Sequence, residues 1–136
     1  MKIKIDYKEI PPSFREEKDA LKTLGIKNWE EIKDITNEEI LSINHNHHLG
    51  STRGLNKLRC LALLICELGI SINEASILLH SGISSLEALA KLTPQELNSR
   101  FCRLKNLLNL KSDIKEYLTK SYQWIDIAKK KLGITN

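Results

Sequence analysis

Apolar residues recur along the chain at helical spacing, and four of these runs end in a glycine that is followed by isoleucine. Glycine adopts the left-handed conformation at a helix C-terminus without a Cβ clash, and the apolar residue after it folds back onto the last turn. We therefore expect helices to end at turns built on Gly25, Gly69, Gly82 and Gly133.

Helix start signals follow these turns closely. Ser71–Glu74 and Ser84–Glu87 both fit the S-x-x-E capping box, in which two side chains satisfy backbone N–H groups at the start of a helix. Similar signals, each a small polar residue three positions before an acid, begin at Ser13, Asn28, Thr36 and Thr93. The pattern predicts an all-α fold of about eight short helices.

Two segments between these signals are related in sequence. Residues 21–40 align with residues 78–97 at a constant offset of 57, and six of the twenty aligned pairs are identical. Each copy is predicted to form a helix, a glycine turn, a short helix and a third helix that starts at a threonine. A unit this small does not bury its own apolar face, so we expect the two copies to share a core.

Other segments complete the predicted architecture. Leu55–Leu68 is apolar on nearly every side, which is typical of a buried central helix. Lysine and isoleucine alternate in Lys2–Asp6 without an evident partner strand, so residues 1–12 are predicted to form an extended arm. Residues 13–136 are predicted to be a single helical domain, with the two repeats around the central helix.

Composition narrows the class of protein. Of the 136 residues, 41% are hydrophobic and 28% charged, as in an ordinary globular domain. No apolar run approaches the roughly 20 residues of a membrane span, and the N-terminus lacks a signal-peptide core. Cys60, Cys66 and Cys102 are too few for a disulfide scaffold. We expect reduced thiols, a cytoplasmic location and no membrane partner.

Positive charge is concentrated after residue 42. Residues 1–42 carry 8 basic and 10 acidic side chains, whereas residues 43–136 carry 13 basic and 7 acidic ones. The excess lies in Arg53–Arg59 and in residues 98–131. A bias of this size permits a polyanionic partner without requiring one.

Five segments in a fixed order characterise the chain further: Pro12–Glu16, Leu21–Ile26, Asn56–Ala62, Glu74–Ile83 and Gln123–Lys129. Through them the chain resembles an uncharacterised cyanobacterial family, a domain of unknown function related to helix-hairpin-helix repeats. In DNA-binding helix-hairpin-helix modules a second glycine lets backbone N–H groups reach a phosphate. Lys27, Ser71 and Ser84 occupy that position here. The resemblance therefore implies the turn structure, with either nucleic-acid or protein contact.

Two basic clusters are the candidate binding sites. The first is Gly50, Ser51, Thr52, Arg53, Lys57 and Arg59, where free N–H groups at a helix start beside cations would form a phosphate cradle. The second is Arg100, Arg103 and Lys105, extended by Lys111 and Lys115. Arg100 and Arg103 share a helix face, which would also suit a solvated surface opposite Phe101.

Three histidines lie close together before the first cluster. A metal site would use the imidazoles of His45, His47 and His48, completed by Cys60 or His80. The spaced ligand pairs of structural zinc sites are absent from the sequence, so a solvated polar loop is favoured. No metal and no cofactor are predicted.

The sequence contains no combination of nucleophile, base and acid that is typical of catalysis. We therefore expect a non-catalytic module that contacts nucleic-acid phosphates without reading base sequence. The alternative is a protein–protein adaptor that docks on a larger complex. An enzyme or metal-dependent switch that uses the histidines is the third hypothesis.

Overall fold

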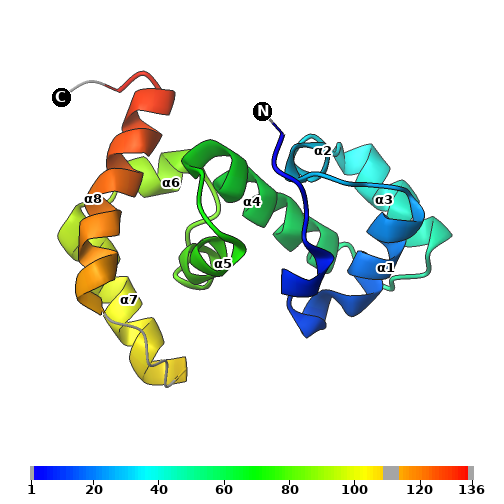
Figure 1. Ribbon diagram of the computed structural model, residues 1–136, viewed down its shortest axis with the longest axis horizontal. Coiled ribbons are helices and arrows are strands. Elements are labelled where there is room, and N and C mark those ends of the chain that lie inside the picture. The colour runs from blue at the N-terminus through cyan, green and yellow to red at the C-terminus, as the bar shows by residue number, and fades with distance from the viewer. Residues whose placement is uncertain (1, 109–113, 135–136) are drawn as a thin grey trace. The chain divides into compact units, whose positions relative to one another are not determined.

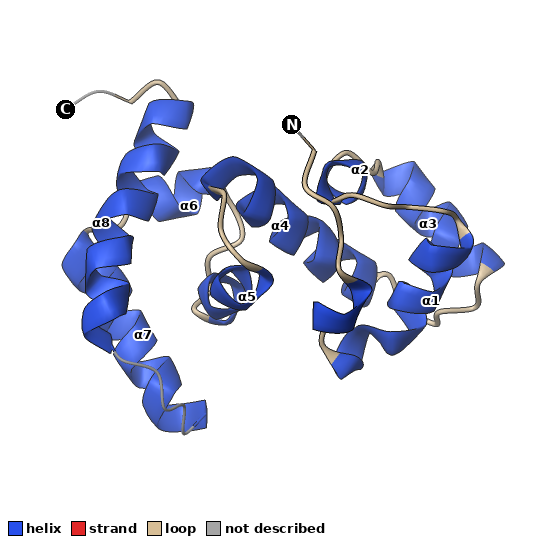
Figure 2. Ribbon diagram, viewed as in Figure 1, coloured by secondary structure: helices blue, strands red, loops and turns tan. Residues whose placement is uncertain are grey.

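The computed structural model describes residues 2–108 and 114–134, except the side chains of residues 107–118, and these ranges are all-α (Figure 2). This described part contains eight α-helices, which confirms the predicted fold class. The helices are α1 (Arg15–Thr23), α2 (Trp29–Lys33), α3 (Asn37–Asn46), α4 (Arg53–Leu68), α5 (Ile72–His80), α6 (Leu86–Ala90), α7 (Pro94–Leu108) and α8 (Ile114–Lys131). Two 3-10 turns, η1 (Tyr7–Glu9) and η2 (Pro12–Phe14), precede them.

The chain divides into two compact units, Met1–Cys66 and Glu67–Asn136. The division falls in the last turn of α4, so α1 to α4 belong essentially to the first unit and α5 to α8 to the second (Figure 1). Each unit contains one of the two sequence repeats. The single domain predicted over residues 13–136 stays a prediction.

The glycine turns end helices as predicted. Positive φ angles occur at Gly25 (74°), Gly69 (66°) and Gly82 (86°). After α1 the Ile26 N–H donates to the Leu21 carbonyl over 3.1 Å, and after α5 the Ile83 N–H donates to the Leu78 carbonyl over 3.0 Å. This bond across six residues around a left-handed glycine is the Schellman motif, which satisfies carbonyls at the helix end.

Side-chain caps start four of the described helices at the predicted residues, Asn28, Thr36, Ser71 and Thr93. Thr36 and Ser71 form complete capping boxes with the acids three positions later. Two predicted starts are wrong. The side chain of Ser85, not Ser84, accepts from a backbone N–H of α6, because α6 begins one residue later than predicted. Ser13 provides no cap, because Pro12 places it inside a 3-10 turn and α1 begins only after that turn.

The two repeats fold alike at the offset of 57 residues. The caps Asn28 and Thr36 correspond to Ser85 and Thr93, so α1, α2 and α3 correspond to α5, α6 and α7. The buried apolar positions also correspond: Leu21, Trp29, Ile32 and Ile40 in the first copy and Leu78, Leu86, Leu89 and Leu97 in the second. The sequence repeat is therefore a structural repeat.

Helix α4 supplies a large part of the first unit's core, as the apolar run predicted. Its buried side chains within that unit are Leu55, Leu58, Leu61, Ala62, Leu64 and Ile65. Arg53 and Lys57 are exposed, so the helix has one narrow polar face and is not apolar on every side.

The N-terminal segment lies against the turn between α1 and α2. The Ile5 N–H donates to the Lys27 carbonyl and the Trp29 N–H donates to the Ile3 carbonyl, both over 2.9 Å, which makes a single antiparallel bridge. The Ile5 side chain is buried. The alternating segment thus pairs with a turn of the first repeat rather than with a strand.

Helix α8 packs on both α6 and α7 in the second unit (Figure 1). The rings of Phe101 on α7 and Trp124 on α8 meet edge to face, with centroids 6.2 Å apart and planes at 83°. Both side chains are buried. This aromatic pair joins the two longest helices of the second unit.

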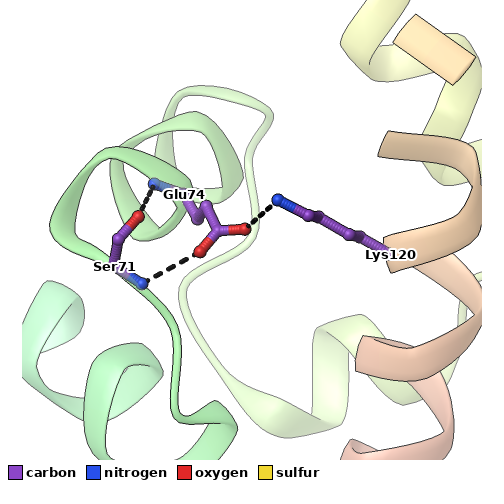
Figure 3. Close-up of polar contacts among 3 residues, drawn as sticks. All are labelled: Ser71, Glu74 and Lys120. Atoms are coloured by element: carbon purple, nitrogen blue, oxygen red, sulfur yellow. Dashed lines mark hydrogen bonds and ion pairs between the residues drawn. The ribbon is translucent and has the colours of Figure 1, made fainter. Parts of the chain in front are cut away.

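A polar contact joins α8 to the start of α5 (Figure 3). The Glu74 carboxylate accepts from the Ser71 N–H over 3.0 Å and from Lys120 Nζ over 2.7 Å. Burial alone would raise the pKa of Glu74, but the hydrogen bonds from Lys120 and Ser71 and the lysine charge together lower it below its ordinary value of 4.5. One carboxylate therefore caps α5 and holds α8.

The lowered pKa of Glu74 predicts acid sensitivity of the second unit. A carboxyl whose folded pKa lies below its unfolded value contributes stability that is complete above pH 4.5 and is lost as the pH falls through the folded pKa. Urea titrations at several pH values should show this loss in the natural chain. Glu74→Gln should flatten the dependence below pH 4.5, and an unchanged dependence would contradict the role of Glu74.

Candidate functional site

The first predicted cluster lies at the start of α4. Gly50 has a φ of 77°, and the Ser51 hydroxyl accepts from the Arg53 N–H over 3.1 Å. Arg53 and Lys57 are exposed, whereas Thr52 is half-buried. Gly50, Ser51 and Thr52 therefore form the loop before α4, and Arg53 and Lys57 lie in its first two turns.

Arg59, the last member of this cluster, is directed into the first unit. Its guanidinium donates to the Ile35 carbonyl and to the Asn56 Oδ1, both over 3.0 Å. Hydrogen bonds from arginine to a carbonyl beyond a helix end stabilise that end. Arg59 therefore has a structural role that joins α4 to the residues after α2, and Arg53 and Lys57 are the exposed cations of the cluster.

A carboxylate of the chain itself lies at the predicted phosphate cradle. Glu17 on α1 is only 8% exposed, and a Cβ built on Gly54 would lie 2.5 Å from its Cδ. The positive end of a helix dipole favours a negative charge at this position. Glu17 thus occupies the first turn of α4, where the sequence predicted space for an external anion.

The histidine segment is more helical than predicted. His45 belongs to the last turn of α3, and His48 has a φ of 54° at the end of that helix. The Leu49 N–H donates to the Asn44 carbonyl over 3.1 Å, so His48 takes the position that glycine holds in the other helix ends. In the described residues no group of three His, Cys, Asp or Glu side chains is placed to hold a metal ion.

The second cluster forms part of a basic hollow. The hollow has a volume of about 370 Å³ and is lined by His80, Ser81, Arg100, Arg103 and Leu104. It brings the end of α5 together with the middle of α7. Lys105 is half-buried and does not line it. Lys111 and the side chain of Lys115 lie outside the described residues.

Arg100 lines this hollow and lies beside the Gly82 turn. Its Nη1 donates to the Ser81 carbonyl over 3.1 Å, and a Cβ on Gly82 would lie 3.4 Å from the same Nη1. The Ser81 Oγ is buried and has no hydrogen-bond partner in the described part of the chain. Arg103 and His80 are exposed. The site therefore has one anchored guanidinium, one open guanidinium and an unpaired hydroxyl.

The chemistry of this hollow favours an anion. Two guanidinium groups and an imidazole line it, and no lining residue is acidic. Arginine binds carboxylates and phosphates through charge-assisted hydrogen bonds, often two at once. The sequence pattern predicted that Arg100 and Arg103 share a face, but it did not predict His80 and Ser81 beside them. The sequence signal that could have indicated this proximity is the Gly82 turn, which directs the end of α5 toward α7.

None of the three cysteines forms a disulfide within the described residues. Among these residues no single helix is long and apolar enough to cross a membrane, and only the bent pair α4 and α5 reaches that length and composition together.

Comparison with known proteins identifies the family. No curated protein and no solved structure matches the chain. A family model described as Domain of unknown function (DUF4332) matches residues 11–131, which is most of the chain. The match confirms the predicted resemblance to an uncharacterised family. The chain belongs to the DUF4332 family.

Proposed function

We propose that the chain is a non-catalytic binding module, related to helix-hairpin-helix repeats, that contacts nucleic-acid phosphates without reading base sequence. The observation that supports this function is the basic hollow at the Gly82 turn. There an exposed Arg103 and an anchored Arg100 provide charged donors beside a helix–turn–helix unit. Phosphate contacts of this kind supply affinity without base specificity.

Side chains would replace the backbone contacts of glycine-rich hairpins. Ser84 follows Ile83 where a second glycine would be needed, so its Cβ occupies the space for close backbone approach. Arg103, which lines the hollow with His80 and Ser81 at the end of α5, provides a side-chain donor from α7 instead. A guanidinium extends farther than a backbone N–H and carries a full charge, so it contacts a phosphate without requiring glycine.

Arg103→Ala should weaken binding to a short random-sequence duplex by about tenfold or more at low salt. A hydrogen bond to a charged group contributes about 1.5–3 kcal/mol, and the arginine side chain is exposed and available. Fluorescence anisotropy with duplex and single-stranded DNA at several salt concentrations measures this. The slope of log affinity against log salt should also decrease by about one on loss of one phosphate contact.

Arg15→Ala is the matched control, because Arg15 is an exposed arginine on α1 outside both clusters. Its loss should change affinity only slightly. The double variant Arg53→Ala with Lys57→Ala tests the first cluster and leaves Arg59 in its structural role. The proposal is wrong if no binding occurs even at low salt, or if Arg15→Ala weakens binding as much as Arg103→Ala.

A protein adaptor is the second candidate function, and one observation favours it. The first repeat holds the chain's own N-terminal segment against its turn through backbone hydrogen bonds, which supports peptide recognition by this type of turn.

A further inference from the structure

The turn of the first repeat binds the N-terminal segment through three kinds of group. The Lys27 carbonyl accepts from Ile5 and the Trp29 N–H donates to Ile3, both over 2.9 Å. The Glu30 carboxylate accepts from the Ile3 N–H, with Oε2 at 3.0 Å. An acceptor, a donor and a carboxylate within four residues thus form a short edge for an extended peptide.

The second repeat has the same three groups at the offset of 57 residues. They are the Ser84 carbonyl, the Leu86 N–H and the Glu87 carboxylate, and glutamate is identical in the two copies. In the described part of the chain none of these groups has a hydrogen-bond partner. We call Ser84–Glu87 the open edge.

The open edge is exposed at its two ends, and it has one more unpaired N–H donor than its counterpart. Ser84 and Glu87 are exposed. In the first repeat the Lys27 N–H is occupied by the Glu31 carboxylate over 3.0 Å. The second repeat has Ala88 at the position of Glu31, so the Ser84 N–H has no such partner among the described residues.

We propose that the open edge binds an extended segment of a partner protein that alternates basic and β-branched apolar residues. The first repeat supports this occupant, because the segment that it binds has this pattern from Lys2 to Ile5. Charge complementarity supports it too, since Glu87 is the one charged side chain in residues 84–90. Pairing of backbone with an extended peptide is an established mode of recognition.

The same chemistry separates this surface from the nucleic-acid site. Alternating N–H and carbonyl groups match a peptide backbone, which has both donors and acceptors, whereas a phosphate has acceptors only. The Glu87 charge would repel a phosphate. Peptide binding at the open edge is therefore independent of Arg103, and Arg103→Ala should leave it unchanged.

The test uses the full chain and a synthetic peptide with the sequence of residues 2–10. Titration followed by amide NMR shifts should show saturable changes at Ser84, Leu86 and Glu87. Glu87→Ala should lower the affinity about fivefold, as expected for loss of one hydrogen bond. The matched control is Asp126→Ala, which removes an exposed acid of the second unit and should have little effect.

A peptide with proline in place of Ile5 sharpens the test. In the first repeat the Ile5 N–H is the donor to the Lys27 carbonyl, and proline lacks this N–H. We expect this peptide to bind at least tenfold more weakly. Equal binding of both peptides, shifts confined to Lys27–Glu30, or no saturable shift would overturn the proposal. Self-association lost on removal of residues 2–6 would place a second copy on the edge and would also overturn it.

Discussion

Trp124→Ala is expected to lower the free energy of unfolding of the second unit by about 3–5 kcal/mol. Trp124 is 3% exposed, and its ring meets Phe101 at a centroid distance of 6.2 Å. Truncation removes buried apolar surface and the aromatic contact, and it leaves a cavity between α7 and α8. Urea denaturation followed by circular dichroism measures the change.

Tyr122→Ala is the control on the same helix. Tyr122 is 53% exposed, and its hydroxyl accepts one hydrogen bond from Gln95 at the surface. Its truncation should change the free energy of unfolding by roughly 0.5 kcal/mol, as is usual for surface positions. Similar losses for the two variants would show that α8 is not held by Trp124.

Leu21→Ala and Leu78→Ala are expected to destabilise their own units by similar amounts, about 2–5 kcal/mol each. The two leucines occupy the same position in the two repeats, and both are 0% exposed. The backbone carbonyl of each leucine accepts the hydrogen bond that closes its helix end, and alanine retains this carbonyl, so the variants test side-chain packing alone. Amide hydrogen exchange, resolved by residue, shows which unit loses protection in each variant.

Leu41→Ala provides the comparison for these two variants. Leu41 lies on α3 and is 60% exposed, so its loss should cost little. A loss below 1 kcal/mol for either Leu21→Ala or Leu78→Ala would show that the corresponding repeat does not depend on that leucine. Unequal losses would show that the repeats differ in packing despite their common backbone.

Most of the fold was predictable because its signals are local. A turn such as Gly82 needs only a glycine, an apolar residue after it and a helix before it, and a capping box needs residues three positions apart. Because the sequence is repeated, several of these signals occur at corresponding positions in both copies. Register was the weaker point, because Ser84–Glu87 fits the capping-box pattern although Ser85 provides the cap. Alignment of Ser85 with Asn28 would have identified the correct residue.

The candidate site was only partly predictable because its contacts join distant residues. Arg59 and Ile35 are 24 positions apart, and Arg100 and Ser81 are 19 apart. The local sequence does not distinguish an arginine at the surface from an arginine that stabilises a helix end. Glu17 of α1 likewise lies against Gly54 of α4, a residue far from it in the sequence. The hollow could therefore be identified only from the tertiary structure.

The Schellman turns and capping boxes also affect how the chain reaches its fold. Each is completed by residues within about six positions, so a helix and its ends form before distant parts of the chain meet. Chains dominated by such short-range contacts search fewer conformations and fold in microseconds to milliseconds. Nascent repeats would therefore acquire their helices early during synthesis, with few exposed strand edges that promote aggregation.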